Sequence, residues 1–205
     1  VLVLEFIESK TLEPKTVREN LNKIVPIIRK IHEEIPNKLS GQPQIFWVFY
    51  VIKYYSNYLL NNNSSHISLI PSLLKKAEKL EKLSSPREIV FGHNDLLAAN
   101  FLDDGSKIWV VDWEYGGFND PLFDIGGLSS NNDLDENLEN EVLEMYFKEK
   151  PSKDLIIKYN AMKTASLLRE TMWSMVSEIT SKIEFNYAEY TSDNLKKFEE
   201  SFDKL

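Results

Sequence analysis

The stretch from residue 89 to residue 124 constrains the fold of this chain more than any other part of its sequence. Two short apolar runs, Ile89–Phe91 and Ile108–Val111, each end at a polar or turn-forming residue. Runs this short and bounded in this way are typical of β-strands. We therefore expect two short strands flanking a loop. Three polar side chains should then meet at one end of these strands: Asp95, Asn100 and Asp112.

These three side chains have the order and chemistry of a phosphotransfer site. Phosphoryl transfer needs a carboxylate that positions the attacking hydroxyl, and oxygen ligands that hold Mg²⁺ against the nucleotide phosphates. The catalytic loop of protein kinases has an aspartate, then an asparagine, then a further aspartate after the next strand. We therefore predict Asp95 as the base, Asn100 and Asp112 as Mg²⁺ ligands, and ATP as the phosphoryl donor.

Each part of this pattern also has an ordinary structural interpretation. A His-x-Asp triplet occurs by chance, and a carboxylate at the end of a strand is commonly a turn former or a helix cap. The hypothesis depends on all three residues occurring together and in order. Asp103, Asp104 and Gly105 predict a hairpin turn between the strands, so we do not take those carboxylates as metal ligands.

Longer motifs surround the site. They are His93-Asn-Asp95-Leu-Leu-x-x-Asn100, Val-Asp112-Trp-Glu114-Tyr, Asn119, and Phe123-Asp124-Ile-Gly, with Leu4-Glu-Phe-Ile, Ile31-His32-x-x-x-Pro36 and Met172-Trp173-Ser through Tyr190 elsewhere. Together they resemble the choline/ethanolamine kinase branch of the aminoglycoside phosphotransferase-like kinases. The resemblance covers nearly the whole chain, and the segment between about residues 37 and 87 is its least diagnostic part.

The resemblance implies an α+β, mostly helical fold. It would be the C-terminal lobe of a protein-kinase-like fold, with a small β-hairpin carrying the catalytic loop. Residues 1–12 would be the hinge between lobes and residues 13–205 the lobe itself, with the N-terminal lobe absent from this chain, so this fragment alone would be inactive. The backbone of Glu5, Phe6 and Ile7 would meet the adenine edge, although a plain edge strand explains this segment equally well.

The same resemblance assigns supporting roles within the site. His93 would organise the catalytic loop, and Asp124 would hold that loop by hydrogen bonds. Glu114 would either support the metal site or be a surface charge, and the sequence does not separate these. His32 is interpreted as a structural, hydrogen-bonded histidine, because no carboxylate or nucleophile accompanies it in the pattern.

The acceptor pocket is where the sequence departs from the family. A quaternary ammonium is recognised by aromatic faces, and Trp173 and Tyr190 match positions that line the choline pocket, with Tyr187 a weaker candidate. Simple helix packing is the alternative explanation for these rings. Glu170 replaces a further tryptophan of the better-known choline kinases, and Asn131, with Asp133 nearby, replaces a glutamate. These changes favour a smaller, more polar or primary-amine acceptor.

Helical periodicity accounts for most of the remaining chain. We expect an amphipathic helix from Pro14 to just before Pro36, an aromatic-rich one over residues 45–60, and one from Pro71 to Leu83. A polar junction over residues 129–133 would cap a helix over residues 134–147. A long helix over residues 153–183 and a last one containing Leu195, Phe198 and Phe202 would follow.

Composition limits the classes of function. The 205 residues are 42% hydrophobic and 27% charged, with no apolar run of about 18 residues, so we expect one domain and no membrane span. The absence of cysteine excludes disulfides, thiolate metal sites and cysteine nucleophiles, and fits a cytoplasmic protein. A formal charge of −8 opposes nucleic-acid binding and suits a cationic small molecule.

The sequence therefore predicts a phosphotransferase acting on a cationic or aminated alcohol such as choline or ethanolamine. A related kinase for aminoglycosides or other aminated alcohols is the alternative within the same chemistry. A non-catalytic, kinase-like binding module is the alternative from another class, and a purely structural helical scaffold is a distant third.

Overall fold

The computed structural model describes residues 5–85 and 88–205, and most of these residues are helical. The helices are α1 (Pro14–Glu19), α2 (Leu21–Glu34), α3 (Val48–Asn61), α4 (Ile70–Leu83), α5 (Pro121–Asn131), α6 (Glu136–Phe147), α7 (Lys153–Thr180) and α8 (Tyr187–Phe202). The short strands are β1 (Lys10–Thr11), β2 (Val90–Gly92), β3 (Phe101–Asp103), β4 (Ile108–Val110) and β5 (Gly117–Asn119). The predicted mostly helical α+β class is confirmed.

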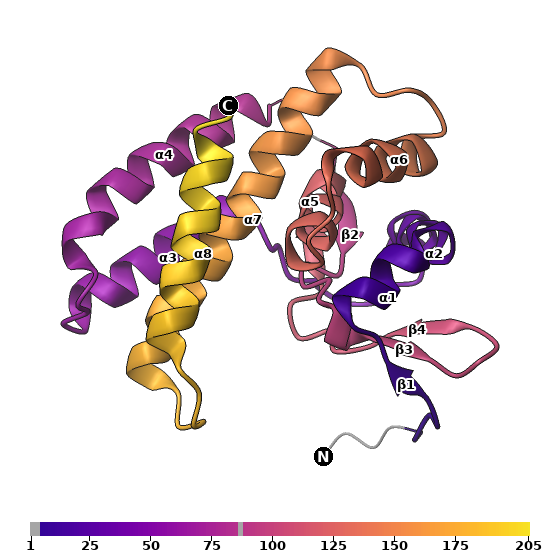
Figure 1. The fold of residues 1–205 in the computed structure, drawn as a ribbon, viewed down its shortest axis with the longest axis horizontal. Coiled ribbons are helices and arrows are strands. Elements are labelled where there is room, and N and C mark those ends of the chain that lie inside the picture. The colour runs from indigo at the N-terminus through magenta and orange to yellow at the C-terminus, as the bar shows by residue number, and fades with distance from the viewer. Residues whose placement is uncertain (1–4, 86–87) are drawn as a thin grey trace.

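Helix α7 is the central element of the molecule. Figure 1 shows α3 and α4 on one side of α7, with α5, α6, the first helices and the strands on the other, and α8 running alongside. The side chain of Ser152 caps α7 by accepting a hydrogen bond from the Leu155 N–H (3.2 Å). Buried residues occur on nearly every face of this helix, as expected of a helix surrounded by others.

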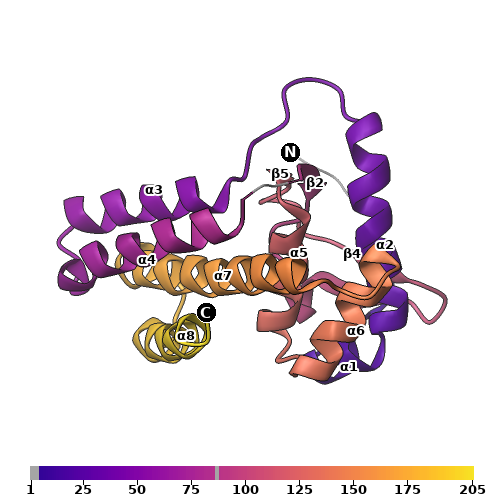
Figure 2. The same cartoon turned by 90° about the horizontal axis from the view of Figure 1, so that it is seen from above.

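The first predicted helix is in fact two. Its apolar face is buried as expected, but the helix breaks at Asn20, between α1 and α2. The Asn20 amide donates to the Thr16 carbonyl (2.9 Å), and this local bond replaces a backbone bond of a continuous helix. Pro26 lies inside α2, and the helix continues through it. Figure 2 shows the long connection from α2 to α3.

The aromatic segment forms helix α3, and only part of it is core. Phe49 and Tyr55 are buried, whereas Tyr50 and Tyr54 are 64% and 65% exposed. Core packing, which is the usual role of aromatic residues at helical spacing, therefore does not apply to these two exposed rings.

Helix α4 occurs where it was expected, with its leucines against α3 and α7 and most of its lysines and glutamates exposed. Lys76 and Glu81 are the half-buried exceptions, paired with Glu199 and with the Trp47 indole N–H.

The strands pair differently from the hairpin that was expected between Ile89–Phe91 and Ile108–Val111. β4 pairs with β3 in a hairpin, with β1 on its outer edge, and β2 pairs with β5 in a separate sheet. The Asp104 carboxylate closes the hairpin turn by accepting hydrogen bonds from Ser106, Lys107 and Trp109, and these bonds lower its pKa. The loop that was expected between two paired strands therefore connects two sheets.

Helix α5 was not predicted from the sequence. Ser129 belongs to the buried last part of α5 rather than to a polar junction, and the side chain of Asp135 is the N-cap of α6. Gly126 allows α5 to cross α7 closely, because a Cβ there would lie 2.7 Å from the Lys163 Cα. This close crossing places the start of α5 beneath the predicted catalytic loop.

Candidate active site

The carboxylate of Asp124 in α5 holds the backbone of the predicted catalytic loop. It accepts hydrogen bonds from the backbone N–H groups of His93 (2.7 Å) and Asn94 (2.6 Å). It is also 2.9 Å from Nε2 of His32, whose Nδ1 is 2.7 Å from the Tyr146 hydroxyl. Burial alone would raise the pKa of Asp124, but the hydrogen bond and charge of His32, together with His93, outweigh burial and lower it. The loop is thereby anchored to α5, α2 and α6.

Asn94 fixes the turn that precedes the predicted base, and sequence reasoning did not single it out. Its φ of 66° lies in the left-handed region, which asparagine tolerates better than most residues. Its amide donates to the carbonyls of Gly92 (3.2 Å), Tyr115 (2.9 Å) and Gly117 (3.1 Å), and its Oδ1 accepts from Asn119 (3.1 Å). One buried side chain thus joins the loop to both strands of the β2–β5 sheet.

The three predicted chemical residues lie at the open end of the β3–β4 hairpin. Nδ2 of Asn100 donates to the Asp95 carbonyl (2.8 Å) and is 3.5 Å from Asp95 Oδ2. The Asn100 carbonyl accepts from the Val111 N–H (3.0 Å), and the Val111 carbonyl is 2.8 Å from Nε2 of His93. Asp112 follows Val111 directly, so it emerges beside Asn100.

The geometry of Asp112 is compatible with a metal ligand. Its φ of 63° is a strained conformation for a residue with a side chain, and its carboxylate is exposed. Among residues 5–85 and 88–205, no cluster of three or more His, Cys, Asp or Glu side chains could hold a metal ion. Mg²⁺ commonly takes only one or two protein carboxylates and fills its remaining positions with phosphate and water oxygens. The donor set of Asn100 and Asp112 fits that pattern.

Arg169 of α7 is part of the site and was missed by sequence reasoning. It is 4% exposed, and its Nη1 donates both to Asp95 Oδ1 (3.2 Å) and to Glu170 Oε2 (2.9 Å). Its guanidinium carbon lies 4.5 Å from the ring centroid of Tyr115. Burial would lower the pKa of Arg169, but the charges of Glu170 and Asp95 outweigh this effect and raise it. No sequence motif marks Arg169, because the stretch around it gives only a helical period.

Next to Glu170 is a group of rings that we call the aromatic wall, in the second half of α7 and at the start of α8. It consists of Trp173, Phe185, Tyr187 and Tyr190. The Tyr190 hydroxyl donates to Glu170 Oε1 (2.8 Å), and burial together with the Glu170 charge raises the pKa of that hydroxyl. The ring of Trp173 lies 6.1 Å from that of Tyr187, and the ring of Phe185 lies 5.7 Å from that of Tyr190. Phe185, which is 56% exposed, was not predicted. The predicted Trp173, Tyr190 and Glu170 thus lie in one region.

The other predicted residues stand apart from this network. Asn131 is the last residue of α5, and no hydrogen bond within the described ranges connects it to Asp95 or Glu170. Glu114 is exposed in the turn after Asp112.

The predicted hinge is described only in part. Residues 1–4 lie outside the described residues, so the expectation for them has no structural counterpart. Glu5 is exposed and the Phe6 side chain is 89% exposed. The Ile7 carbonyl accepts a hydrogen bond from the Ser9 hydroxyl (3.1 Å).

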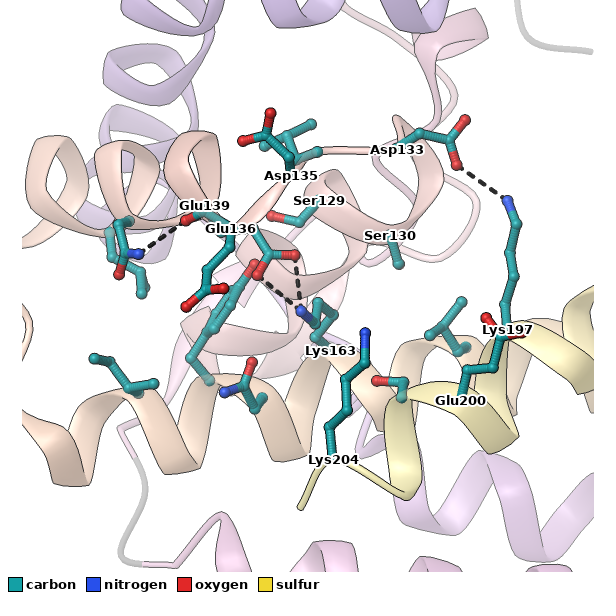
Figure 3. Close-up of a pocket in the computed structure, with 18 of the residues that line it drawn as sticks. Ser129, Ser130, Asp133, Asp135, Glu136, Glu139, Lys163, Lys197, Glu200 and Lys204 are labelled. Atoms are coloured by element: carbon teal, nitrogen blue, oxygen red, sulfur yellow. Dashed lines mark hydrogen bonds and ion pairs between the residues drawn. The ribbon is translucent and has the colours of Figure 1, made fainter.

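A polar hollow of about 790 Å³ lies elsewhere, between the end of α5, the start of α6, α7 and the end of α8. Figure 3 shows that its walls carry paired charges. Lys163 contacts both oxygens of Glu139 (2.7 and 2.8 Å), and Lys197 contacts Asp133 (3.1 Å). None of the three predicted chemical residues lines it. This hollow is therefore distinct from the candidate active site.

Solved structures share this fold. A choline/ethanolamine kinase family protein from Mesorhizobium loti matches with a TM-score of 0.81 at 24% identity, covering 96% of this chain and 68% of that one. Choline kinase LicA from Streptococcus pneumoniae matches at 0.79 and 21%, covering 98% and 69%. The GDP and kanamycin complex of APH(2")-IIia matches at 0.63 and 13%, covering 97% and 70%. The fold is therefore the protein-kinase-like fold of these structures, and this chain spans 68–70% of their length. No described helix combines the length and apolar character needed to cross a membrane.

Sequence comparison narrows this class to a family. The family model for choline/ethanolamine kinase matches residues 2–131, which is more than half of the chain. A probable ethanolamine kinase from Arabidopsis thaliana is 30% identical over 222 residues, covering 92% of this chain and 58% of that protein. Ethanolamine kinase 2 from Homo sapiens is 27% identical over 217 residues, covering 92% and 55%. The chain belongs to the choline/ethanolamine kinase family, and it spans a little over half the length of these relatives.

Proposed function

We propose that the protein transfers the γ-phosphate of ATP to the hydroxyl of a small amino alcohol such as choline or ethanolamine. The observation that carries this proposal is the linked pair of carboxylates, Asp95 and Glu170, with Asn100 on one side and aromatic rings on the other. Family membership and relatives named ethanolamine kinases support the same chemistry. A helical scaffold without activity gives no reason for these polar groups to meet.

Asp95 would act as the base. Its Oδ1 is bound by Arg169, whereas its Oδ2 has only the 3.5 Å contact with Asn100 among the described residues. The acceptor hydroxyl would give its proton to Oδ2 while its oxygen bonds to the γ-phosphorus. The bond from that phosphorus to the bridging oxygen then breaks, and ADP leaves. Such proton transfer typically contributes a factor of about 10²–10⁴ to the rate.

Asn100 and Asp112 would hold Mg²⁺. Because Nδ2 of Asn100 donates to the Asp95 carbonyl, the amide is oriented with Oδ1 available as an oxygen ligand. These two residues would keep the ion beside the nucleotide phosphates, where its charge would offset the negative charge that develops during transfer. The carboxylate of Asp112 is exposed and would supply the second oxygen ligand.

Glu170 and the aromatic wall would bind the amine end of the acceptor. A carboxylate attracts any ammonium group, and the faces of Trp173 and Tyr190 suit a cation. A protonated amine can additionally donate hydrogen bonds to Glu170, which a quaternary ammonium cannot. The replacement of a ring by Glu170 therefore favours ethanolamine over choline as the preferred acceptor.

The test is acceptor-dependent ADP release by the full-length protein. We expect turnover with ethanolamine or choline, and Asp95→Ala should abolish it while nucleotide binding is retained. Asp112→Asn should raise the Mg²⁺ concentration needed for half-maximal rate by about tenfold, since metal ligands contribute directly to affinity. Asp103→Asn, at the far end of the same hairpin, is the matched control and should not change it. Undiminished turnover by Asp95→Ala would refute the assignment of the base.

The same assay separates the remaining candidates. A panel containing choline, ethanolamine and several aminoglycosides, compared by kcat/KM, would identify the acceptor class. Preference for an aminoglycoside would replace the amino alcohol while leaving the phosphotransfer chemistry intact. Absence of Mg²⁺-dependent ADP release with every acceptor would favour a non-catalytic binding module.

A further inference from the structure

A single nitrogen atom connects the two carboxylates of the proposed site. Nη1 of Arg169 lies 3.2 Å from Asp95 Oδ1 and 2.9 Å from Glu170 Oε2. The Tyr190 hydroxyl extends this chain of contacts to the aromatic wall, 2.8 Å from Glu170 Oε1. The proposed base and the proposed amine-binding group are therefore parts of one network.

The bonding of Arg169 is unusual for a purely structural residue. Its side chain is 5% exposed, yet Nε and Nη2 have no hydrogen-bond partner among the described residues. Buried polar groups are nearly always paired, so a guanidinium retained for stability alone should have most of its N–H groups satisfied. Here the guanidinium lies over the ring of Tyr115 and uses one nitrogen for both carboxylates.

The electrostatics of this pair require the cation. Asp95 and Glu170 share one partner atom, so without Arg169 two nearly buried carboxylates would face each other across a poorly hydrated space. Like charges at such a distance repel strongly where water is excluded, and the side chains would turn away from each other. The orientation of Asp95 would then no longer be fixed.

We propose that Arg169 is a positioning residue that couples the base to the amine-binding group. This inference rests on the proposed function and adds to it a residue that does not touch the acceptor. By holding Oδ1 of Asp95, Arg169 directs Oδ2 towards the acceptor hydroxyl. By holding Glu170 with the same nitrogen, it sets the spacing between the hydroxyl end and the amine end of the acceptor.

The test compares kcat and KM for five variants of the full-length protein with ethanolamine as acceptor. Arg169→Met keeps the side-chain volume and should lower kcat about 10- to 100-fold, because misplacing a reacting group by about 1 Å has an effect of this size. Its KM for ATP should stay within about twofold. Arg169→Lys should recover at least part of kcat. Glu170→Gln should raise the KM for ethanolamine more than it lowers kcat.

The matched control is Arg29→Met, which replaces a partly buried arginine on α2 that is paired with Glu33. It should leave both kinetic constants unchanged. Thermal unfolding of each variant shows whether it is folded at the assay temperature. Because Arg169→Met leaves two carboxylates without their cation, the double variant Arg169→Met with Glu170→Gln is included; it removes one of them and should fold, yet remain slow.

The inference is overturned if folded Arg169→Met, or the double variant, keeps kcat within twofold of the wild type. It is also overturned if Arg169→Lys is no faster than Arg169→Met. In both cases the wild type is active, so the proposed function survives. Failure of the proposed function is a different result, in which the wild type itself releases no ADP in response to any amino alcohol.

Discussion

Asp124 is the residue on which the shape of the catalytic loop most directly depends. Its carboxylate accepts two backbone N–H groups of the loop and contacts His32, and it is 3% exposed. Asp124→Asn keeps one acceptor oxygen but turns an NH₂ group towards a donor. Removing one partner of a buried charged network typically costs about 3–5 kcal/mol. We expect a loss of this order in the free energy of unfolding, measured by urea denaturation at pH 7.

The pH dependence of this loss follows from the direction of the pKa shift. The folded pKa of Asp124 is lowered, so the folded state holds this proton less tightly than the unfolded chain, where the pKa is about 3.9. The stabilisation is therefore complete above that value and disappears as the pH falls below it. The gap between wild type and Asp124→Asn should therefore be smaller below about pH 4 than at pH 7. Exposed Asp193→Asn is the control, and a gap that does not narrow in acid would contradict the prediction.

At the residue scale, the sequence identifies site residues that lie close together along the chain and misses those that lie far apart. Asp95, Asn100 and Asp112 could be recognised because they lie close together along the chain at strand ends. Arg169 could not, since it is 74 positions from Asp95 and its neighbours in α7 gave only a helical period. Asn131 was assigned from its position in a motif. Among the described residues it has no hydrogen bond to Asp95 or Glu170, because its place at the end of α5 depends on a helix that was not predicted.

At the level of the elements, the crossing of α5 and α7 determines where Asp124 lies. A Cβ on Gly126 would be 2.7 Å from Cα and 2.8 Å from N of Lys163, and backbone atoms cannot move away without separating the helices. Gly126→Ala should therefore destabilise the fold by about 1–3 kcal/mol, as overpacking usually does. The measurement is urea denaturation of the full-length protein.

Gly127 offers a matched control one residue along the same helix. A Cβ there would meet only side-chain atoms, the Ser166 hydroxyl at 3.3 Å and the Asn131 Nδ2 at 4.0 Å, and these side chains can move. Alanine is favoured over glycine within a helix by up to about 1 kcal/mol. Gly127→Ala should therefore be neutral or stabilising, and equal losses in the two variants would contradict the proposed role of the close crossing.

Periodicity predicts helices reliably where one face is buried and fails where polar side chains decide the ends. The apolar faces of α2, α4 and α7 lie where the spacing of their residues predicted them. The break at Asn20 and the extension of α5 through Ser129 arise from hydrogen bonds between side chains and backbone carbonyls. The pairing of β2 with β5 depends on contacts across 25 to 29 residues, and strands of three residues carry little register information.

At the scale of the whole molecule, α7 is the main element against which both halves of the structure pack. It packs against α3 and α4 on one side and against α5 on the other, and it also carries Arg169 and Glu170. Substrate-binding groups from α7 and the catalytic loop on the strands therefore keep their spacing only while both halves remain packed on this helix. Cooperative unfolding of the two halves is the expected consequence.

Leu168→Ala tests this coupling at the centre of α7. Leu168 is fully buried, and truncating such a residue costs about 2–5 kcal/mol. Unfolding in urea would be followed by fluorescence in two backgrounds, one keeping only Trp47 at the start of α3 and the other only Trp109 in β4. If α7 is the shared core, Leu168→Ala should shift both midpoints by the same amount. Ile157→Ala, at a site on α7 that is 49% exposed, should change the free energy of unfolding seen by either probe by no more than about 1 kcal/mol. A shift seen by Trp47 alone would mean that the halves unfold separately and that α7 does not couple them.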